Sequence, residues 1–121
     1  MNRWLTTALA ALAFSGLGGG VSADVFGDAA KGEGIFRQCA GCHQVGEGAE
    51  NRIGPQLNGI FGRRAGTVDG FRYSDSFQRA GAKGLEWHAE DLNVFLENPK
   101  QLVPGTRMSF RGIRNREQRA D

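Results

Sequence analysis

The chain has 121 residues, a formal net charge of +2, and an ordinary globular balance of 40% hydrophobic and 23% charged residues. This length indicates a single domain, and the weak positive charge argues against a nucleic-acid-binding role. Glycine is abundant at 19 residues, so such a short chain has a thin apolar core. A covalently held apolar cofactor would enlarge that core, much as metals and disulfides stabilise other small domains.

Residues 1–23 have the pattern of a secretory signal peptide. Arg3 supplies a positive start, Trp4–Leu17 is mostly apolar, and Val21–Ala23 is a small-residue cleavage site. An uncleaved membrane anchor is the alternative, but a spanning helix needs about 20 apolar residues and this segment is shorter. We therefore expect export to the periplasm with cleavage near Ala23, leaving residues 24–121 as the domain.

Helical signals recur along residues 24–121, separated by glycine-rich loops. Asp28 is a suitable N-cap for a first helix, on which Gly32, Phe36 and Cys39 share one face. Further signals predict a short helix after Ser74-Asp75-Ser76, a turn from Gly81 to Gly84, and a helix from Ala89 to Glu97 that Pro99 ends.

The run Cys39-Ala40-Gly41-Cys42-His43 is the attachment signature of a c-type haem. Each thiol can form a thioether to one porphyrin vinyl group, and the adjacent imidazole can bind the iron. A thioredoxin-like redox pair would need a βαβ setting, which the surrounding sequence lacks. A zinc site would need more ligands, but no second cysteine pair exists and His88 is the only other histidine.

Met108 is the only methionine after the leader, and it lies in the loop Pro104-Gly105-Thr106-Arg107-Met108-Ser109-Phe110. A lone methionine is usually core filler. This one lies away from any helical stripe, which suits a second axial ligand from the opposite side of a haem. A thioether favours ferrous iron, so a His/Met pair raises the reduction potential.

The residues after the leader resemble class I cytochrome c, of the mitochondrial and soluble bacterial type, from Gly27 to Asp121. The runs that carry the resemblance are Gly27-Asp28, Lys31-Gly32, Ile35-Phe36, Cys39–His43, Gly54-Pro55, Phe61-Gly62-Arg63, Tyr73, Trp87, Phe95–Lys100 and Pro104–Met108. The resemblance implies a small all-α fold around one covalent haem c, with His43 and Met108 as the axial ligands.

The same resemblance implies roles for residues around the haem. The Pro55 carbonyl would accept a hydrogen bond from His43. Tyr73 and Trp87 would bind a haem propionate, with Arg63 offsetting its charge. Two further residues complete the expected site: Thr106 beside that propionate, and Phe110 over the exposed haem edge.

In one respect the sequence departs from the family pattern. Family members end in a long helix that crosses the first helix at the position of Gly32, but this chain stops after about one and a half turns of that element. We therefore expect an incomplete C-terminal helix that leaves Gly32 and Phe36 without a packing partner. The sequence is then either a fragment or a less stable relative.

The expected function is one-electron transfer rather than catalysis, because two axial ligands leave no open site on the iron. Family analogy suggests a monomer that shuttles electrons from a cytochrome bc complex to a terminal oxidase or a photosynthetic reaction centre. Transient docking would use basic residues near the Met108 loop: Lys100, Arg107, Arg111 and Arg114. The alternative is a peroxidase-like haem enzyme or a ligand sensor in which Met108 is off the iron.

Overall fold

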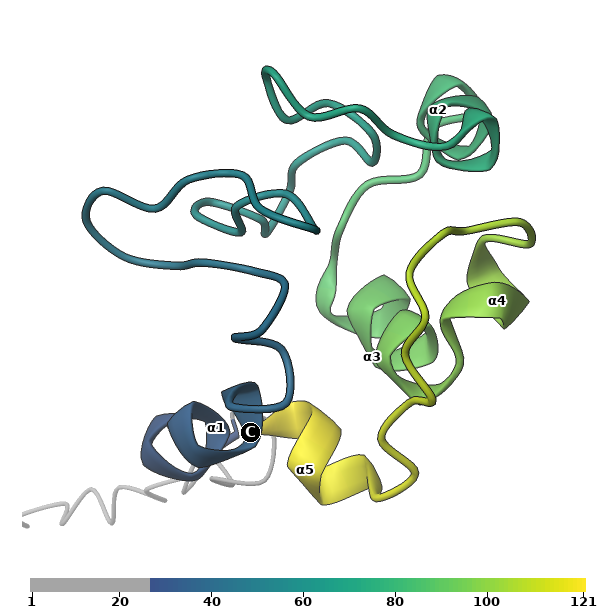
Figure 1. Cartoon of the computed structure of the whole chain (residues 1–121). Coiled ribbons are helices and arrows are strands. Elements are labelled where there is room, and N and C mark those ends of the chain that lie inside the picture. Colours follow the sequence, from purple (N-terminus) through teal and green to yellow (C-terminus); the bar gives the residue numbers. More distant parts are fainter. Residues whose placement is uncertain (1–26) are drawn as a thin grey trace, which may run out of the picture.

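The computed structural model describes residues 27–121, so the expected signal peptide lies outside the described residues. Its helices, in chain order, are α1 (Ala29–Phe36), α2 (Asp75–Ala82), α3 (Ala89–Glu97), α4 (Pro99–Leu102) and α5 (Arg116–Ala120). The only β pairing in this part of the chain is an isolated bridge between Arg64 and Glu86. A long irregular segment joins α1 to α2 (Figure 1). The all-α expectation is confirmed.

Short polar side chains begin three of these helices. The Asp28 carboxylate accepts from the N–H groups of Ala30 and Lys31, at 3.0 and 3.2 Å. Ser74 and Asn115 cap α2 and α5 in the same manner. Because the first backbone donors of a helix have no partner within it, these caps fix where each helix starts.

Two helix boundaries differ from the sequence predictions, and one short helix is not predicted. The helix α1 ends at Phe36, so Cys39 lies beyond it in a series of turns and not on its face. Gly81 belongs to the last turn of α2 and not to the following turn. Pro99 ends α3 as predicted, but it also begins the unpredicted α4. Proline fits the first position of a helix because it lacks a backbone N–H, and an N–H at that position would have no partner within the helix.

The core is small and aromatic. Trp87, Phe95, Val103 and Ala65 form one buried cluster, with Val103 only 1% exposed. Trp87 and Phe95 have ring centroids 5.0 Å apart, and Phe77 lies within 6.1 Å of both. This cluster joins α2, α3 and the loop that precedes α3, and it supports the loop that contains Met108.

Helices α1 and α5 lie side by side, although they come from opposite ends of the described chain (Figure 1). A Cβ atom at Gly32 would lie 2.7 Å from the carbonyl carbon of Asp121, so only glycine permits this approach. The Asp121 carboxylate also accepts from the Asp28 N–H at 2.8 Å. The expectation that Gly32 lacks a partner is therefore wrong, whereas Phe36 is only partly buried.

The short helix α5 is anchored through Arg119. Its guanidinium donates to the carbonyls of Ile113 and Arg114 at 2.7 and 2.8 Å, and to the side chain of Asn93 at 2.7 Å. A carboxylate oxygen of Glu97 lies 3.6 Å from the same guanidinium. These contacts tie α5 to α3. Within residues 27–121, no helix has the length and apolar character required to cross a membrane.

Candidate functional site

Turns after α1 present the imidazole of His43. The Cys39 N–H donates to the Phe36 carbonyl at 2.7 Å, and the His43 N–H donates to the Cys39 carbonyl at 2.9 Å. The Nδ1 atom of His43 lies 2.7 Å from the carbonyl oxygen of Pro55. Since a carbonyl can only accept, Nδ1 carries the proton, and the lone pair is then on Nε2.

Gly54 makes room for this imidazole. Its N–H donates to the Cys42 carbonyl at 2.9 Å, which holds the Gly54–Pro55 turn against the cysteine motif. A Cβ atom at position 54 would lie 2.7 Å from both ring nitrogens of His43. Real Cβ atoms do not approach this closely, so the ring can occupy this place only beside a glycine.

The two cysteines are free thiols. Burial raises the pKa of the Cys39 thiol, and the neighbouring Cys42 raises it further. A raised pKa is the opposite of what a redox-active dithiol needs, since such sites lower the pKa of the attacking thiol. No strand flanks the motif in residues 27–121, and no three His, Cys, Asp or Glu side chains gather there as a metal site. The redox and zinc interpretations therefore lose support.

The donor set fits a covalent haem. Two free thiols lie on one set of turns, next to an imidazole whose Nε2 is available as a metal ligand. A carbonyl that receives the other ring N–H is the usual partner of a metal-binding histidine, because it fixes both the tautomer and the ring orientation. Cys39, Cys42 and His43 are thus suited to hold a haem, with the Pro55 carbonyl orienting His43.

The Met108 loop rests on the aromatic core. Met108 is partly buried against the core cluster, and its N–H donates to the Thr106 hydroxyl oxygen at 3.2 Å. Thr106 itself is 8% exposed. Gly105 has φ +87°, and a Cβ atom there would collide with the Ser76 hydroxyl, so the loop packs directly on α2. These contacts fix the backbone that leads into Met108.

The predicted propionate-binding residues occupy different environments. Trp87 is buried in the core, and Tyr73 is partly buried with its hydroxyl oxygen accepting the Val68 N–H at 3.2 Å. Burial raises the pKa of Tyr73, although the Val68 hydrogen bond and the Arg63 charge oppose this. Both side chains come from the segments that flank α2. Phe110 is partly buried in the Met108 loop.

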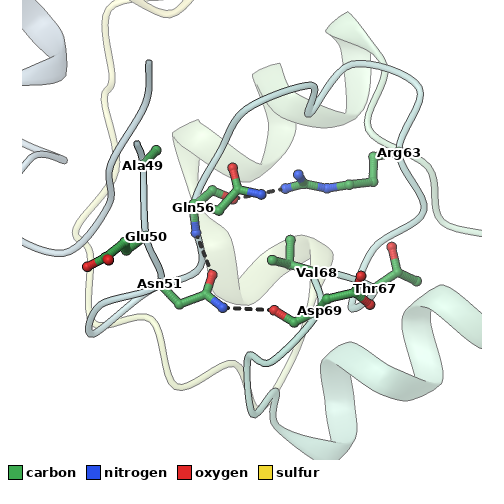
Figure 2. Close-up of a pocket in the computed structure, with 8 residues that line it drawn as sticks. All are labelled: Ala49, Glu50, Asn51, Gln56, Arg63, Thr67, Val68 and Asp69. Atoms are coloured by element: carbon green, nitrogen blue, oxygen red, sulfur yellow. Dashed lines mark hydrogen bonds between the residues drawn. The ribbon is translucent and has the colours of Figure 1, made fainter. Parts of the chain in front are cut away.

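Arg63 lines an open cavity of about 480 Å³ together with Asn51, Gln56 and Val68 (Figure 2). Its guanidinium donates to the main-chain carbonyls of Asn58 and Gln56, at 2.9 and 3.4 Å. No carboxylate forms an ion pair with it among residues 27–121. The positive charge therefore remains available to an anionic group of a ligand.

The basic residues predicted for docking are all exposed: Lys100, Arg107, Arg111 and Arg114. Arg107 also donates to the Arg72 carbonyl at 2.7 Å, which ties the Met108 loop to the segment before α2. His88 is exposed as well and is the N-cap of α3.

Two residues of the site escape prediction from the sequence. The Gly54-Pro55 pair signals only a turn, although the missing side chain of Gly54 is what admits the His43 ring. Asn51 links two loops, because it accepts from the Gln56 N–H at 3.0 Å and donates to the Asp69 carbonyl at 2.9 Å. An asparagine in a glycine-rich loop is a general signal for such backbone contacts, but it does not identify the distant partner.

Comparison with known proteins identifies the family. A family model described as "Cytochrome c" matches residues 29–121. Cytochrome c-550 of Ancylobacter novellus is 51% identical over 92 residues, which cover 76% of this chain and 85% of the relative. Cytochrome c2 of Agrobacterium tumefaciens is 48% identical over 92 residues, covering 76% and 83%. The solved structure of cytochrome c2 from Rhodospirillum centenum superposes with a TM-score of 0.73 at 37% identity, covering 78% of this chain and 92% of that one.

These matches confirm the predicted class I cytochrome c fold and the covalent haem c cofactor. They also support electron transfer over the enzyme alternative. On the fold, the cysteine motif and the family match together, this chain belongs to the cytochrome c family and is an electron carrier with covalent haem c.

Proposed function

We propose that this chain is an exported one-electron carrier in which His43 and Met108 are the axial ligands of a haem bound through Cys39 and Cys42. The observation that carries the proposal is the 2.7 Å contact between His43 Nδ1 and the Pro55 carbonyl, which leaves Nε2 as the donor atom. When bound, the haem iron supplies the one-electron couple. The chain's contribution is to hold its ligands in place before and after electron transfer.

The residues around these ligands have matching roles in the proposal. Arg63 places a cation beside a propionate, and Tyr73, Trp87 and Thr106 supply hydroxyl and indole hydrogen-bond donors near it. Met108 lies on a loop that Thr106 braces from within. Phe110, two residues further on, shields the haem edge. A site whose ligands are already held rigidly needs little rearrangement on a change of charge, which suits fast electron transfer.

The ligand assignment is tested with Met108→Leu, which keeps an apolar side chain of similar volume but removes the sulfur donor. We expect covalent haem to be retained, the weak ferric absorption band in the red to disappear, and the reduction potential to fall. Met108→Ala should show the same changes and, in addition, open the iron to carbon monoxide. An unchanged potential in Met108→Leu would show that Met108 is not the ligand.

The proposed partners are membrane redox complexes: a cytochrome bc complex as the donor, and a terminal oxidase or a photosynthetic reaction centre as the acceptor. The segment from Asn98 to Arg116 contains five basic residues and no Asp or Glu, so it forms a basic stretch around the Met108 loop. A local field of one sign speeds encounter with an oppositely charged partner, even when the net charge of the whole protein is small. Export to the periplasm would bring the carrier to such complexes.

The docking face is tested with the double variant Lys100→Glu and Arg114→Glu. We expect slower second-order electron transfer to an acidic redox partner, with the difference shrinking as salt rises. The control, Lys31→Glu with Lys83→Glu, makes the same change in net charge outside this segment, at two other exposed positions. Equal rates for the two double variants at low ionic strength would refute docking through the basic segment.

A further inference from the structure

The peptide group between Pro55 and Gln56 is hydrogen-bonded at both of its ends. Its carbonyl oxygen lies 2.7 Å from Nδ1 of His43. Its N–H donates to Oδ1 of Asn51 at 3.0 Å (Figure 2). One rigid, planar amide therefore connects the imidazole of His43 to the side chain of Asn51.

The orientation of the Asn51 amide follows from its two partners. Its Nδ2 donates to the Asp69 carbonyl at 2.9 Å, which only the NH₂ end can do (Figure 2). Its Oδ1 faces the Gln56 N–H, which only an oxygen can accept. Asn51 and Gln56 are both partly buried, so water competes weakly for this bond.

Hydrogen bonds in a chain polarise one another. When a peptide N–H donates, electron density moves toward the oxygen of the same amide, which becomes a stronger acceptor. A stronger acceptor at Pro55 pulls harder on the Nδ1 proton of His43. This makes Nε2 a better electron donor, as partners of metal-bound histidines generally do.

We propose that Asn51 is a positioning residue that tunes the donor strength of His43 through the Pro55–Gln56 peptide. The inference rests on the proposed function in one respect, since it takes His43 as an iron ligand. A more strongly donating imidazole favours ferric iron, so Asn51 lowers the reduction potential of the carrier. The link to Asp69 keeps the Asn51 oxygen aimed at the Gln56 N–H.

Asn58 provides a matched comparison within the same segment. Its side chain also forms two hydrogen bonds, accepting from the Gly46 N–H and donating to the Gly46 carbonyl, each at 2.8 Å. Neither bond touches the Pro55–Gln56 peptide. A substitution at Asn58 therefore loosens the loop without changing the polarisation of the amide that holds His43.

The experiment uses the full chain with its haem and compares Asn51→Ala and Asn51→Asp with Asn58→Ala and Asn58→Asp. Asn51→Ala removes the acceptor for the Gln56 N–H. Asn51→Asp keeps and strengthens that acceptor but loses the donor to Asp69. Two readouts are taken: the reduction potential, and the chemical shift and exchange rate of the His43 Nδ1 proton by NMR.

We expect Asn51→Ala to raise the potential, move the Nδ1 proton upfield and speed its exchange. Asn51→Asp should move the Nδ1 proton downfield, slow its exchange, and lower the potential more than the charge-matched Asn58→Asp does. Shifts of one sign in both Asn51 variants, or shifts equal to those of the Asn58 variants, would overturn the proposal. Should Asn51→Ala fail to fold, the near-isosteric aspartate pair decides the question.

Failure of the ligand assignment gives a different result. If His43 does not bind the iron, the parent protein lacks a low-spin spectrum and a paramagnetically shifted His43 ring. If His43 does bind the iron but Asn51 does not tune it, the parent spectrum is low-spin and the Asn51 substitutions leave the chemical shift and exchange rate of the His43 Nδ1 proton unchanged.

Discussion

The close contact between Gly54 and the His43 ring makes Gly54→Ala a sharp test of how the site is built. The added methyl group would lie 2.7 Å from Nδ1 and Nε2, well inside the distance at which carbon and nitrogen atoms repel. The backbone at position 54 cannot retreat freely, because its N–H is bonded to the Cys42 carbonyl at 2.9 Å. The imidazole must therefore move away from the Pro55 carbonyl.

Two free-energy costs determine how far Gly54→Ala destabilises the folded protein. Inserting a methyl group into a packed site costs about 1–3 kcal/mol, and weakening the His43–Pro55 hydrogen bond adds about 1 kcal/mol. We expect Gly54→Ala to lower the free energy of unfolding by about 2–4 kcal/mol, a large share of the roughly 5–15 kcal/mol typical of a small domain. The measurement is denaturant unfolding of the haem-loaded protein, followed by the absorbance of the haem.

A displaced imidazole should also weaken the axial bond, so the low-spin spectrum of Gly54→Ala should be lost at lower denaturant than the helical signal. Gly34→Ala is the control, because a methyl group at position 34 would meet no neighbouring atom within 4 Å. Alanine favours a helix over glycine by about 1 kcal/mol, so this variant should be neutral or slightly more stable. Parent-like stability and spectrum in Gly54→Ala would refute the inference that the His43 ring packs against position 54 and requires a glycine there.

Two further predictions concern the helix crossing and the single tyrosine. Gly32→Ala should destabilise the protein by up to about 2 kcal/mol after its gain in helix propensity, because its methyl group meets the Asp121 backbone; stability equal to that of Gly34→Ala in denaturant unfolding would contradict this. Burial raises the pKa of Tyr73, the only tyrosine of the chain, so an ultraviolet titration should find tyrosinate forming above the ordinary pKa of about 10. A raised pKa means that folding favours the neutral phenol of Tyr73, so Tyr73 contributes to stability below about pH 10 and this contribution is lost as pH rises through the raised pKa. The variant Tyr73→Phe should not show this loss of stability.

The sequence predicts the elements whose signals are local. The helix α3 has the bounds that the sequence predicts, because Glu90 and Asp91 favour its start and Pro99 ends it. The cysteine motif is likewise contiguous, so its chemistry can be recognised without a fold. The end of α1 cannot be predicted from periodicity, since the apolar spacing continues to Cys39 while the backbone leaves the helix at Phe36.

The site is less predictable wherever it depends on contacts between distant residues. The family resemblance implies a role for Arg63, but its two bonds to the Gln56 and Asn58 carbonyls depend on how the loop folds back. The Asn51–Asp69 contact joins residues that are 18 positions apart in two irregular segments. Such segments have no periodicity, so nothing in their sequence specifies which of several polar side chains faces which carbonyl.

Because the apolar core is small, the loop that follows His43 (residues 44–58) is ordered mainly by hydrogen bonds. Few apolar side chains of residues 44–58 are buried, and Val45 and Ile53 are 52% and 80% exposed. Order there comes instead from side-chain amides that satisfy backbone groups: Gln44 on Glu50, Asn51 on Gln56 and Asn58 on Gly46. Each such bond contributes only about 1 kcal/mol, but together they replace the packing that the loop lacks. Of these amides, only Asn51 contacts the Pro55–Gln56 peptide whose carbonyl orients His43, so the Asn51 bond contributes both to the order of this loop and to the orientation of His43, whereas the Gln44 and Asn58 bonds contribute to the loop alone.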